Sequence, residues 1–399
     1  MKNSLDDFAA SVENELSAIM YYWQNFTVDT MHAGFYGSVD NNNLPDLNAI
    51  KGVVLHARIL WSFSAACNYT GQTAYLPVAE RAFDYIEKYF IDREFGGVYW
   101  SLDAKGNIAD GRKQIYALAF CIYGMSEYFA ATKKQTALDE AIRLYQCIEQ
   151  YSYDPAYKGY FEAFSREWGA LEDFRLSSKD ANEKKTMNTH LHVVEAYANL
   201  YKIWPDAGLK EKIAELLQLF VTHFINTQTF HLKLFFDEQW QEKPDVISYG
   251  HDIEAAWLLQ QCAEIIGDTH LITRLKKYAI HITNAAMEGI DTDGGMWYEY
   301  HPVTNELIQQ KHWWPQAEAM VGLFNAYQIS KNEQYLHVCL KNWQFIQAHI
   351  IDKVNGEWYW GVLADNSIMP NQDKAGFWKC PYHNSRACIE LLQRIKLLA

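Results

Sequence analysis

The chain has 399 residues, of which 15% are aromatic, and its formal net charge at pH 7 is −14. Nucleic acids and anionic membranes are held by clustered Lys and Arg, so this charge argues against both as partners and favours a small neutral ligand. The seven cysteines are scattered and form no C-x-x-C pair, which argues against a disulfide framework and a thiolate zinc site.

The N-terminal stretch MKNSLDDFAASVENEL alternates acidic and apolar residues at helical spacing and contains no signal-peptide apolar run. A membrane-spanning helix needs about 18 consecutive apolar residues, and no window of the chain approaches this. We therefore expect a cytoplasmic protein with no membrane segment.

Helical patterns follow one another along the chain in pairs. The first helix of each pair is amphipathic and charged, which predicts an outer helix, and the second is apolar nearly all round, which predicts a buried inner helix. In chain order the pairs are Leu5–Asn25 with Val53–Tyr69, Tyr75–Phe90 with Gln114–Thr132, Thr136–Gln150 with Asn188–Lys202, Leu209–Ile225 with Asp252–Ile266, Thr269–Met287 with Pro315–Ser330, and Glu333–Ile350 with Asn384–Leu397.

Short glycine–aromatic segments separate the pairs and recur about every 60 residues. They begin at Gly34, Gly97, Gly159, Gly295 and Gly356, and the missing member falls near Leu232–Trp240. Six helical hairpins joined by short β-hairpins or turns predict an all-α fold, an (α/α)6 barrel that comprises residues 1–399 as a single catalytic domain. An open α-solenoid is the alternative. Two longer loops are expected at Gly169–Thr186 and Val362–Phe377.

Polar and aromatic side chains gather at the predicted starts of the inner helices, which should all lie on one face of the barrel. These residues are Arg58, Tyr116, Asn188, His190, His192, His251, Glu254, Trp313, Trp314, Glu318, Trp378, His383 and Arg386. The set contains no H-E-x-x-H string or recognisable ligand spacing, and the chain has no phosphate-binding or dinucleotide fingerprint, so we expect neither a metal nor a cofactor.

Histidines are the candidate acid–base groups because imidazole titrates near neutral pH. His251 and Glu254 stand at i and i+3, so the carboxylate could orient the imidazole or instead pair with an arginine. His383 lies at a predicted helix start, where it could act as a base or as a cap. His190 and His192 point to different sides of a helix, so only one is expected to reach the centre.

Arg58 lies within an apolar helix, where an unpaired guanidinium is costly. We expect a buried ion pair with an acid such as Glu254 or Glu318, an oxyanion-binding role, or both. Rings at the predicted mouth suit sugar binding, since aromatic faces stack on pyranose rings; they belong to Tyr116, Trp313, Trp314 and Trp378.

Five strings in chain order resemble the cellobiose 2-epimerases, within the N-acylglucosamine 2-epimerase superfamily. They are LHARILW, MNTHLHVVEAYANL, SYGHDIEAAWLL, WWPQAEA and FWKCPYHNSRACIE, and together they span essentially the whole chain. The resemblance implies an (α/α)6 barrel and reversible, cofactor-free epimerisation at C2 of the reducing-end glucose of β-1,4-linked disaccharides such as cellobiose and lactose.

The resemblance also implies roles for individual residues. His251 and His383 are the implied acid–base pair, and His192 and Arg58 are essential partners. Glu254 supports the histidines. The sugar contacts that the resemblance implies are Asn188, Trp314 and Trp378. From their positions at the predicted mouth we also expect Tyr116, Trp313 and Glu318 to contact the sugar. Alternatives are an N-acylglucosamine or monosaccharide 2-epimerase, a mannose isomerase, a glycoside hydrolase with two inward carboxylates, and a non-catalytic sugar-binding barrel. We expect a monomer or weak homo-oligomer.

Overall fold

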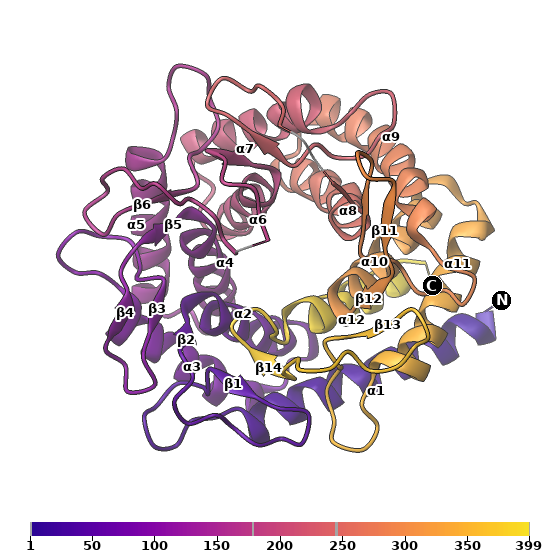
Figure 1. The fold of residues 1–399 in the computed structure, drawn as a ribbon, viewed down its shortest axis with the longest axis horizontal. Coiled ribbons are helices and arrows are strands. Elements are labelled where there is room, and N and C mark those ends of the chain that lie inside the picture. The colour runs from indigo at the N-terminus through magenta and orange to yellow at the C-terminus, as the bar shows by residue number, and fades with distance from the viewer. Residues whose placement is uncertain (1, 178, 244–245, 399) are drawn as a thin grey trace.

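The structure is a computed structural model that describes residues 2–177, 179–243 and 246–398. Over these residues, twelve α-helices form two concentric rings (Figure 1). The inner ring contains α2 (Val53–Thr70), α4 (Ile115–Thr132), α6 (Met187–Ile203), α8 (Tyr249–Ile266), α10 (Trp313–Ser330) and α12 (Tyr382–Lys396). The outer ring contains α1 (Lys2–Phe26), α3 (Leu76–Tyr85), α5 (Gln135–Tyr151), α7 (Ala207–Leu219), α9 (Thr269–Ala286) and α11 (Glu333–Phe345).

The predicted and observed helices agree closely. Three outer helices continue beyond their α-helical part as a π-helical turn, which accounts for the longer predicted ranges; these turns are Ile86–Phe90, Phe220–Phe224 and Ile346–Ile350. The inner helices are buried on all sides, as the first fifteen residues of α2 show. None of the helices in the described ranges has the length and apolar character needed to cross a bilayer.

The helical ring is closed. Each inner helix packs against the next, and α12 packs against both α2 and the outer helix α1. Strand β1 (Ser38–Val39) pairs antiparallel with β14 (Ala375–Gly376), so the two ends of the chain meet, as the indigo and yellow segments show in Figure 1. The predicted (α/α)6 barrel is therefore confirmed, and the open solenoid is wrong.

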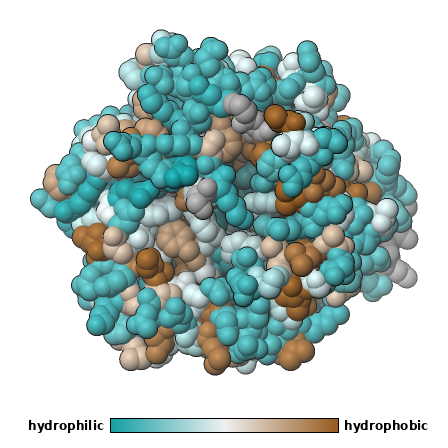
Figure 2. Space-filling view, viewed as in Figure 1, coloured by the Kyte–Doolittle hydropathy of each residue, from teal (hydrophilic) through white to brown (hydrophobic). Residues whose placement is uncertain are grey.

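Short antiparallel sheets connect neighbouring repeats at one end of the barrel, as the predicted hairpins required. Their pairing is β2-β3-β4, β5-β6, β7-β8, β9-β10-β11 and β12-β13, in addition to β1-β14. The strands are β2 (Lys51–Gly52), β3 (Ser101–Leu102), β4 (Ile108–Asp110), β5 (Lys113–Gln114), β6 (Ala163–Phe164), β7 (Lys185–Thr186), β8 (Phe235–Phe236), β9 (Ile247–Ser248), β10 (Glu299–His301), β11 (Glu306–Ile308), β12 (Gln310–His312) and β13 (Gly361–Leu363). Five of them lead directly into an inner helix, so those helices begin on this face. In Figure 2 the face toward the viewer is largely hydrophilic, and its hydrophobic residues are scattered.

A buried lysine–aspartate pair recurs around this ring of sheets. In four repeats, a lysine two residues before an inner helix binds the aspartate of the preceding glycine turn at 2.7–2.8 Å: Lys51–Asp29, Lys113–Asp92, Lys185–Asp154 and Lys311–Asp291. The fourth repeat has Asn226 and Ile247 at these positions, so both charges are replaced together. A buried charge is stable only with its partner, which explains why the two changes occur together.

The uncharged pair in the fourth repeat suggests a test of stability in the first repeat, where the lysine and the aspartate are both present. Lys51→Ile leaves Asp29 buried and unpaired, so we expect a loss of about 3–5 kcal/mol in the free energy of unfolding. Adding Asp29→Asn removes that charge and should restore more than about 1 kcal/mol. Denaturant unfolding measures both, and Lys276→Ile, which breaks an exposed pair with Glu264, should cost less than about 1 kcal/mol. Equal losses in the single and double variants would contradict the pairing argument.

Candidate active site

Side chains at the same position along each inner helix meet at the same depth of the barrel, because an α-helix rises about 1.5 Å per residue. The sixth residue is buried in each of the first five inner helices, and the set comprises Arg58, Phe120, His192, Glu254 and Glu318. Contacts between these side chains join neighbouring helices: the Arg58 guanidinium lies 4.1 Å from the Phe120 ring centroid, which lies 4.7 Å from that of His192. This layer forms the floor of the candidate site.

Three imidazoles surround the same region, and each has Nδ1 in a hydrogen bond. His192 Nδ1 lies 2.8 Å from Glu195 Oε2, His383 Nδ1 lies 2.7 Å from Glu318 Oε1, and His251 Nδ1 lies 2.8 Å from Ser248 Oγ. An ionised carboxylate only accepts hydrogen bonds, so Nδ1 of His192 and of His383 carries the hydrogen. The opposite nitrogen, Nε2, is therefore the atom that can take or return a proton at the centre.

The predicted pair of histidines is brought together around one indole. The Trp314 ring centroid lies 4.8 Å from that of His251 and 5.7 Å from that of His383. Burial, with a contribution from His192, lowers the pKa of His251 to about 3. Burial and the charges of Arg58 and Arg386 lower the pKa of His383 well below its usual range. Burial therefore favours the neutral form of each ring, the form that accepts a proton.

Arg386 holds the carboxylates of the site in one network. This buried guanidinium donates to Glu195 from Nη1 and to Glu254 and Glu318 from Nη2, with 2.6 Å to Glu318 Oε1. Of the two alternatives predicted for Glu254, pairing with an arginine is the one observed: Glu254 binds Arg386, and Ser248 binds the His251 imidazole. Glu254 therefore supports the histidines indirectly, because its partner Arg386 also holds the carboxylates that bind His192 and His383.

The buried position of Glu254 gives a pH prediction. Burial and the neighbouring Glu318 raise the pKa of Glu254 to about 7. A carboxyl whose folded pKa is raised binds more protons in the folded state, so its contribution to stability falls as pH rises from about 4.5 to 7. Glu254→Gln removes this titration. The free energy of unfolding of the variant should therefore fall less steeply with pH, by up to about 1.4 kcal/mol per pH unit. Urea unfolding at several pH values measures this, and parallel pH profiles would contradict it.

Arg58 has no carboxylate partner among the described residues, so the predicted ion pair with Glu254 or Glu318 is wrong. Arg386 binds those two acids instead. Arg58 donates to the Tyr116 hydroxyl at 2.6 Å and to Cys380 Sγ at 3.9 Å, and its Nε has no partner. An uncompensated guanidinium beside neutral groups is suited to binding an oxyanion, the other role predicted for this residue.

The predicted sugar contacts occupy different places. Asn188 and His251 line a cavity of about 350 Å³ together with residues of the loop between β6 and β7. Trp378 is partly buried and packs on Trp100. Trp313 is 3% exposed and packs against Trp360 at 4.7 Å, so it belongs to the packed wall. Two others serve neighbouring groups, since Tyr116 accepts from Arg58 and Glu318 from Nδ1 of His383.

Only one histidine of the NTHLH string faces the centre, as expected. The His190 ring binds the Thr186 carbonyl at 2.7 Å and accepts from the Tyr160 amide at 2.9 Å. His56 binds the first glycine turn in the same way, so His190 is a structural residue of the repeat. Sequence reasoning missed Glu195, although it stands at i+3 from His192, the spacing that drew attention to Glu254.

One group of side chains has the composition of a metal site. Ligand atoms of Glu254, Glu318 and His383 lie within 4.8 Å of one another. The two carboxylates both accept from Nη2 of Arg386. Both carboxylates thus already have a cationic partner, and the group is part of the ion-pair network.

The fold is an (α/α)6 barrel, and its centre gathers three imidazoles with buried arginines and carboxylates. The model of the N-acylglucosamine 2-epimerase family matches residues 34–387. The chain is 47% identical to a cellobiose 2-epimerase of Bacteroides fragilis (96% of this chain, 97% of that protein) and 37% identical to one of Dictyoglomus turgidum (94% and 96%). The solved cellobiose 2-epimerase of Bacillus thermoamylovorans superposes with a TM-score of 0.93 at 38% identity, covering 98% of this chain and 100% of that one.

The chain belongs to the N-acylglucosamine 2-epimerase family and, within it, to the cellobiose 2-epimerases. It is therefore an epimerase, an enzyme of the isomerase class.

Proposed function

We propose that this enzyme epimerises C2 of the reducing-end glucose of β-1,4-linked disaccharides, converting cellobiose to glucosyl-mannose and lactose to epilactose. The observation that carries the proposal is the placement of two buried imidazoles, His251 and His383, around Trp314. Two imidazoles are needed because inversion removes the proton from one face of C2 and returns one to the other.

The proposed reaction begins with opening of the sugar ring, which exposes the C1 aldehyde. Nε2 of one of the two histidines takes the C2 proton, and the electrons of the C–H bond form the C1–C2 double bond of a cis-enediolate as negative charge moves to O1. Arg58 stabilises this oxyanion, with a hydrogen bond from His192. The other histidine, which enters this step as the imidazolium, gives its Nε2 proton to C2 on the opposite face and becomes neutral, and the ring closes. Protonation at C1 instead gives the ketose.

Sugar recognition is proposed for the aromatic and polar residues of the mouth. Trp314 and Trp378 stack on pyranose faces, and Asn188 and Tyr116 supply hydrogen bonds. Trp313 supports the site as part of its packed wall, and Glu318 supports it by holding the His383 ring. The cavity of about 350 Å³ beside His251 gives room for a second ring, which favours a disaccharide over a monosaccharide or N-acylglucosamine. We further propose one catalytic domain over residues 1–399, a cytoplasmic location, and a monomer or weak homo-oligomer.

A glycoside hydrolase is less well supported. Hydrolysis needs one carboxyl group as acid and a second as base or nucleophile at the scissile bond, whereas Glu254 and Glu318 are both bound by Arg386. NMR analysis of products from cellobiose, lactose, mannose and N-acetylglucosamine tests the proposal. A new disaccharide supports epimerisation, and released glucose supports hydrolysis. Turnover of mannose or N-acetylglucosamine alone contradicts the disaccharide assignment, and EDTA should leave the rate unchanged.

A further inference from the structure

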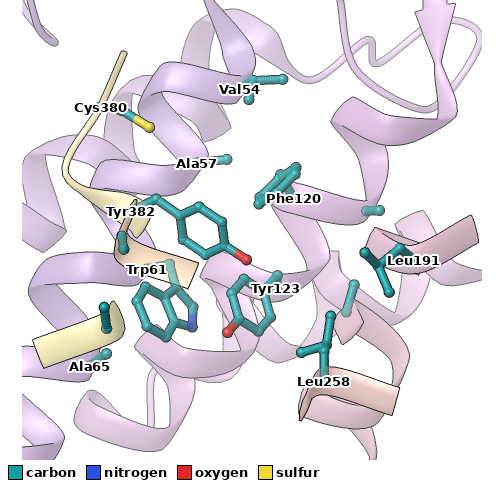
Figure 3. Close-up of a cluster of buried hydrophobic side chains, with 14 of the residues drawn as sticks. Val54, Ala57, Trp61, Ala65, Phe120, Tyr123, Leu191, Leu258, Cys380 and Tyr382 are labelled. Atoms are coloured by element: carbon teal, nitrogen blue, oxygen red, sulfur yellow. The ribbon is translucent and has the colours of Figure 1, made fainter. Parts of the chain in front are cut away.

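Each imidazole of the centre is held by an aromatic ring against its face as well as by the hydrogen bond at Nδ1. The ring centroids are 4.7–4.8 Å apart in the pairs Phe120–His192, Tyr382–His383 and Trp314–His251. Phe120 and Tyr382 belong to the buried cluster shown in Figure 3. A ring contact fixes the plane of an imidazole but not which nitrogen carries the hydrogen, so the tautomer depends on the partner of Nδ1.

The Nδ1 partner of His251 differs in kind from the other two. Nδ1 of His192 and of His383 binds a carboxylate, which only accepts hydrogen bonds, whereas Nδ1 of His251 binds the Ser248 hydroxyl at 2.8 Å. A hydroxyl can accept from Nδ1–H or donate to a bare Nδ1. The tautomer of His251 therefore depends on a neutral group that is able to bind either form of the ring.

Ser248 is placed where a serine normally caps a helix. It ends β9, pairs with Glu299 of β10, and precedes α8, in which His251 is the third residue. At the same position in the preceding repeat, the Thr186 hydroxyl accepts from the backbone amide of Thr189, the third residue of α6. Within the described structure the Ser248 hydroxyl caps no backbone amide of α8 and binds the side chain of the third residue instead.

The backbone at the start of α8 also brings Trp314 onto the same imidazole. A Cβ atom at Gly250 would lie 2.5 Å from the Trp314 ring, so a side chain here would displace the indole. Ser248 is 1% exposed, and the described lining of the cavity that contains Asn188 and His251 does not include it. Ser248 therefore acts on the imidazole and does not contact the sugar.

We propose that Ser248 is the positioning residue of His251. Its hydroxyl accepts a hydrogen bond from Nδ1–H, so the lone pair of the neutral ring is on Nε2, the nitrogen that takes the C2 proton in the proposed reaction. The same bond is kept after Nε2 has taken the proton, because the imidazolium also carries Nδ1–H. The inference rests on the proposed function and gives a neutral hydroxyl the part that Glu195 and Glu318 play for the other two imidazoles.

The initial rate of deuterium uptake at C2, started from pure cellobiose and from pure glucosyl-mannose, measures the two faces separately. Ser248→Ala should slow uptake about five- to tenfold for the epimer that His251→Ala fails to label, because a neutral hydrogen bond to that ring is lost. Uptake into the other epimer should keep the wild-type rate, and KM should change little. Ser248→Thr keeps the hydroxyl and should restore the slowed rate.

The tautomer itself is measured from the ¹⁵N shifts of enzyme labelled in histidine, in which His251→Ala identifies the signals of this ring. The wild-type ring should carry hydrogen on Nδ1 and none on Nε2, and Ser248→Ala should add the form with hydrogen on Nε2. The control Asp268→Ala removes a side chain that does cap a helix, α9. It should lower the free energy of unfolding and leave both uptake rates unchanged.

The proposal is overturned if Ser248→Ala slows both epimers equally or neither of them, or if the wild-type ring carries its hydrogen on Nε2. The measurement on wild-type enzyme decides the matter if no variant at Ser248 folds. If wild-type enzyme epimerises no disaccharide, or if His251→Ala labels both epimers, the proposed function fails instead, so the two failures are distinguishable.

Discussion

His251→Ala and His383→Ala are each expected to lower the rate of cellobiose epimerisation by about 10³-fold or more, because each removes the only group that serves one face of C2. KM should change little, since Trp314 and Asn188 remain in place. The rate is measured by NMR in the forward and reverse directions, and His190→Ala serves as a control because that ring is a structural part of the repeat. Epimerisation at the wild-type rate in either variant would remove its histidine from the mechanism.

Solvent exchange separates the two roles. In D₂O, a variant that keeps one imidazole can still exchange the C2 hydrogen of the epimer whose proton faces it. We expect one variant to label only cellobiose and the other only the glucosyl-mannose epimer, without inversion. Labelling of the same epimer in both variants would show that one histidine serves both faces.

Arg386→Met is expected to lower the free energy of unfolding by about 3–5 kcal/mol, because it leaves three buried carboxylates without their cation. Arg386→Lys should restore part of the loss, since an ammonium keeps the charge but lacks the planar fork that reaches several acids. Denaturant unfolding measures both variants. The control Arg143→Met breaks a pair whose arginine is half exposed, and it should cost less than about 1 kcal/mol.

The pH dependence of this loss follows from Glu195. Burial alone would raise the pKa of this carboxyl, but Arg386, His192 and Tyr382 lower it to about 2. A carboxyl with a lowered folded pKa contributes stability that is present above its ordinary value and is lost as pH falls. The deficit of Arg386→Met should therefore be largest near pH 7 and shrink below about pH 4. A deficit that is constant with pH would show that lost packing, rather than charge, causes it.

Local patterns determined the fold. Helices that are apolar all round could only lie inside, and a glycine turn about every 60 residues fixed the number of hairpins. The predicted ends of the outer helices were also accurate, although the sequence did not reveal that three of them finish as π-helical turns. In the first and third repeats, His56 and His190 reach from the inner helix to the glycine turn and accept a hydrogen bond from its backbone. In the fourth repeat the histidine is in the turn instead: His231 replaces the glycine, and it binds the short side chain of Asp252 on the inner helix.

The sequence by itself identified most of the residues that meet at the centre, because equal positions on repeated helices lie at equal depth, but it missed Glu195. It did not determine how they pair. Arg58 and Arg386 were both candidates for the same acids, and only the closed ring shows that α12 brings Arg386 against Glu195, Glu254 and Glu318, while Arg58 meets Tyr116 and aromatic rings. Pairs between residues 58 or more positions apart depend on how helices are placed across the barrel, and no local spacing encodes that placement.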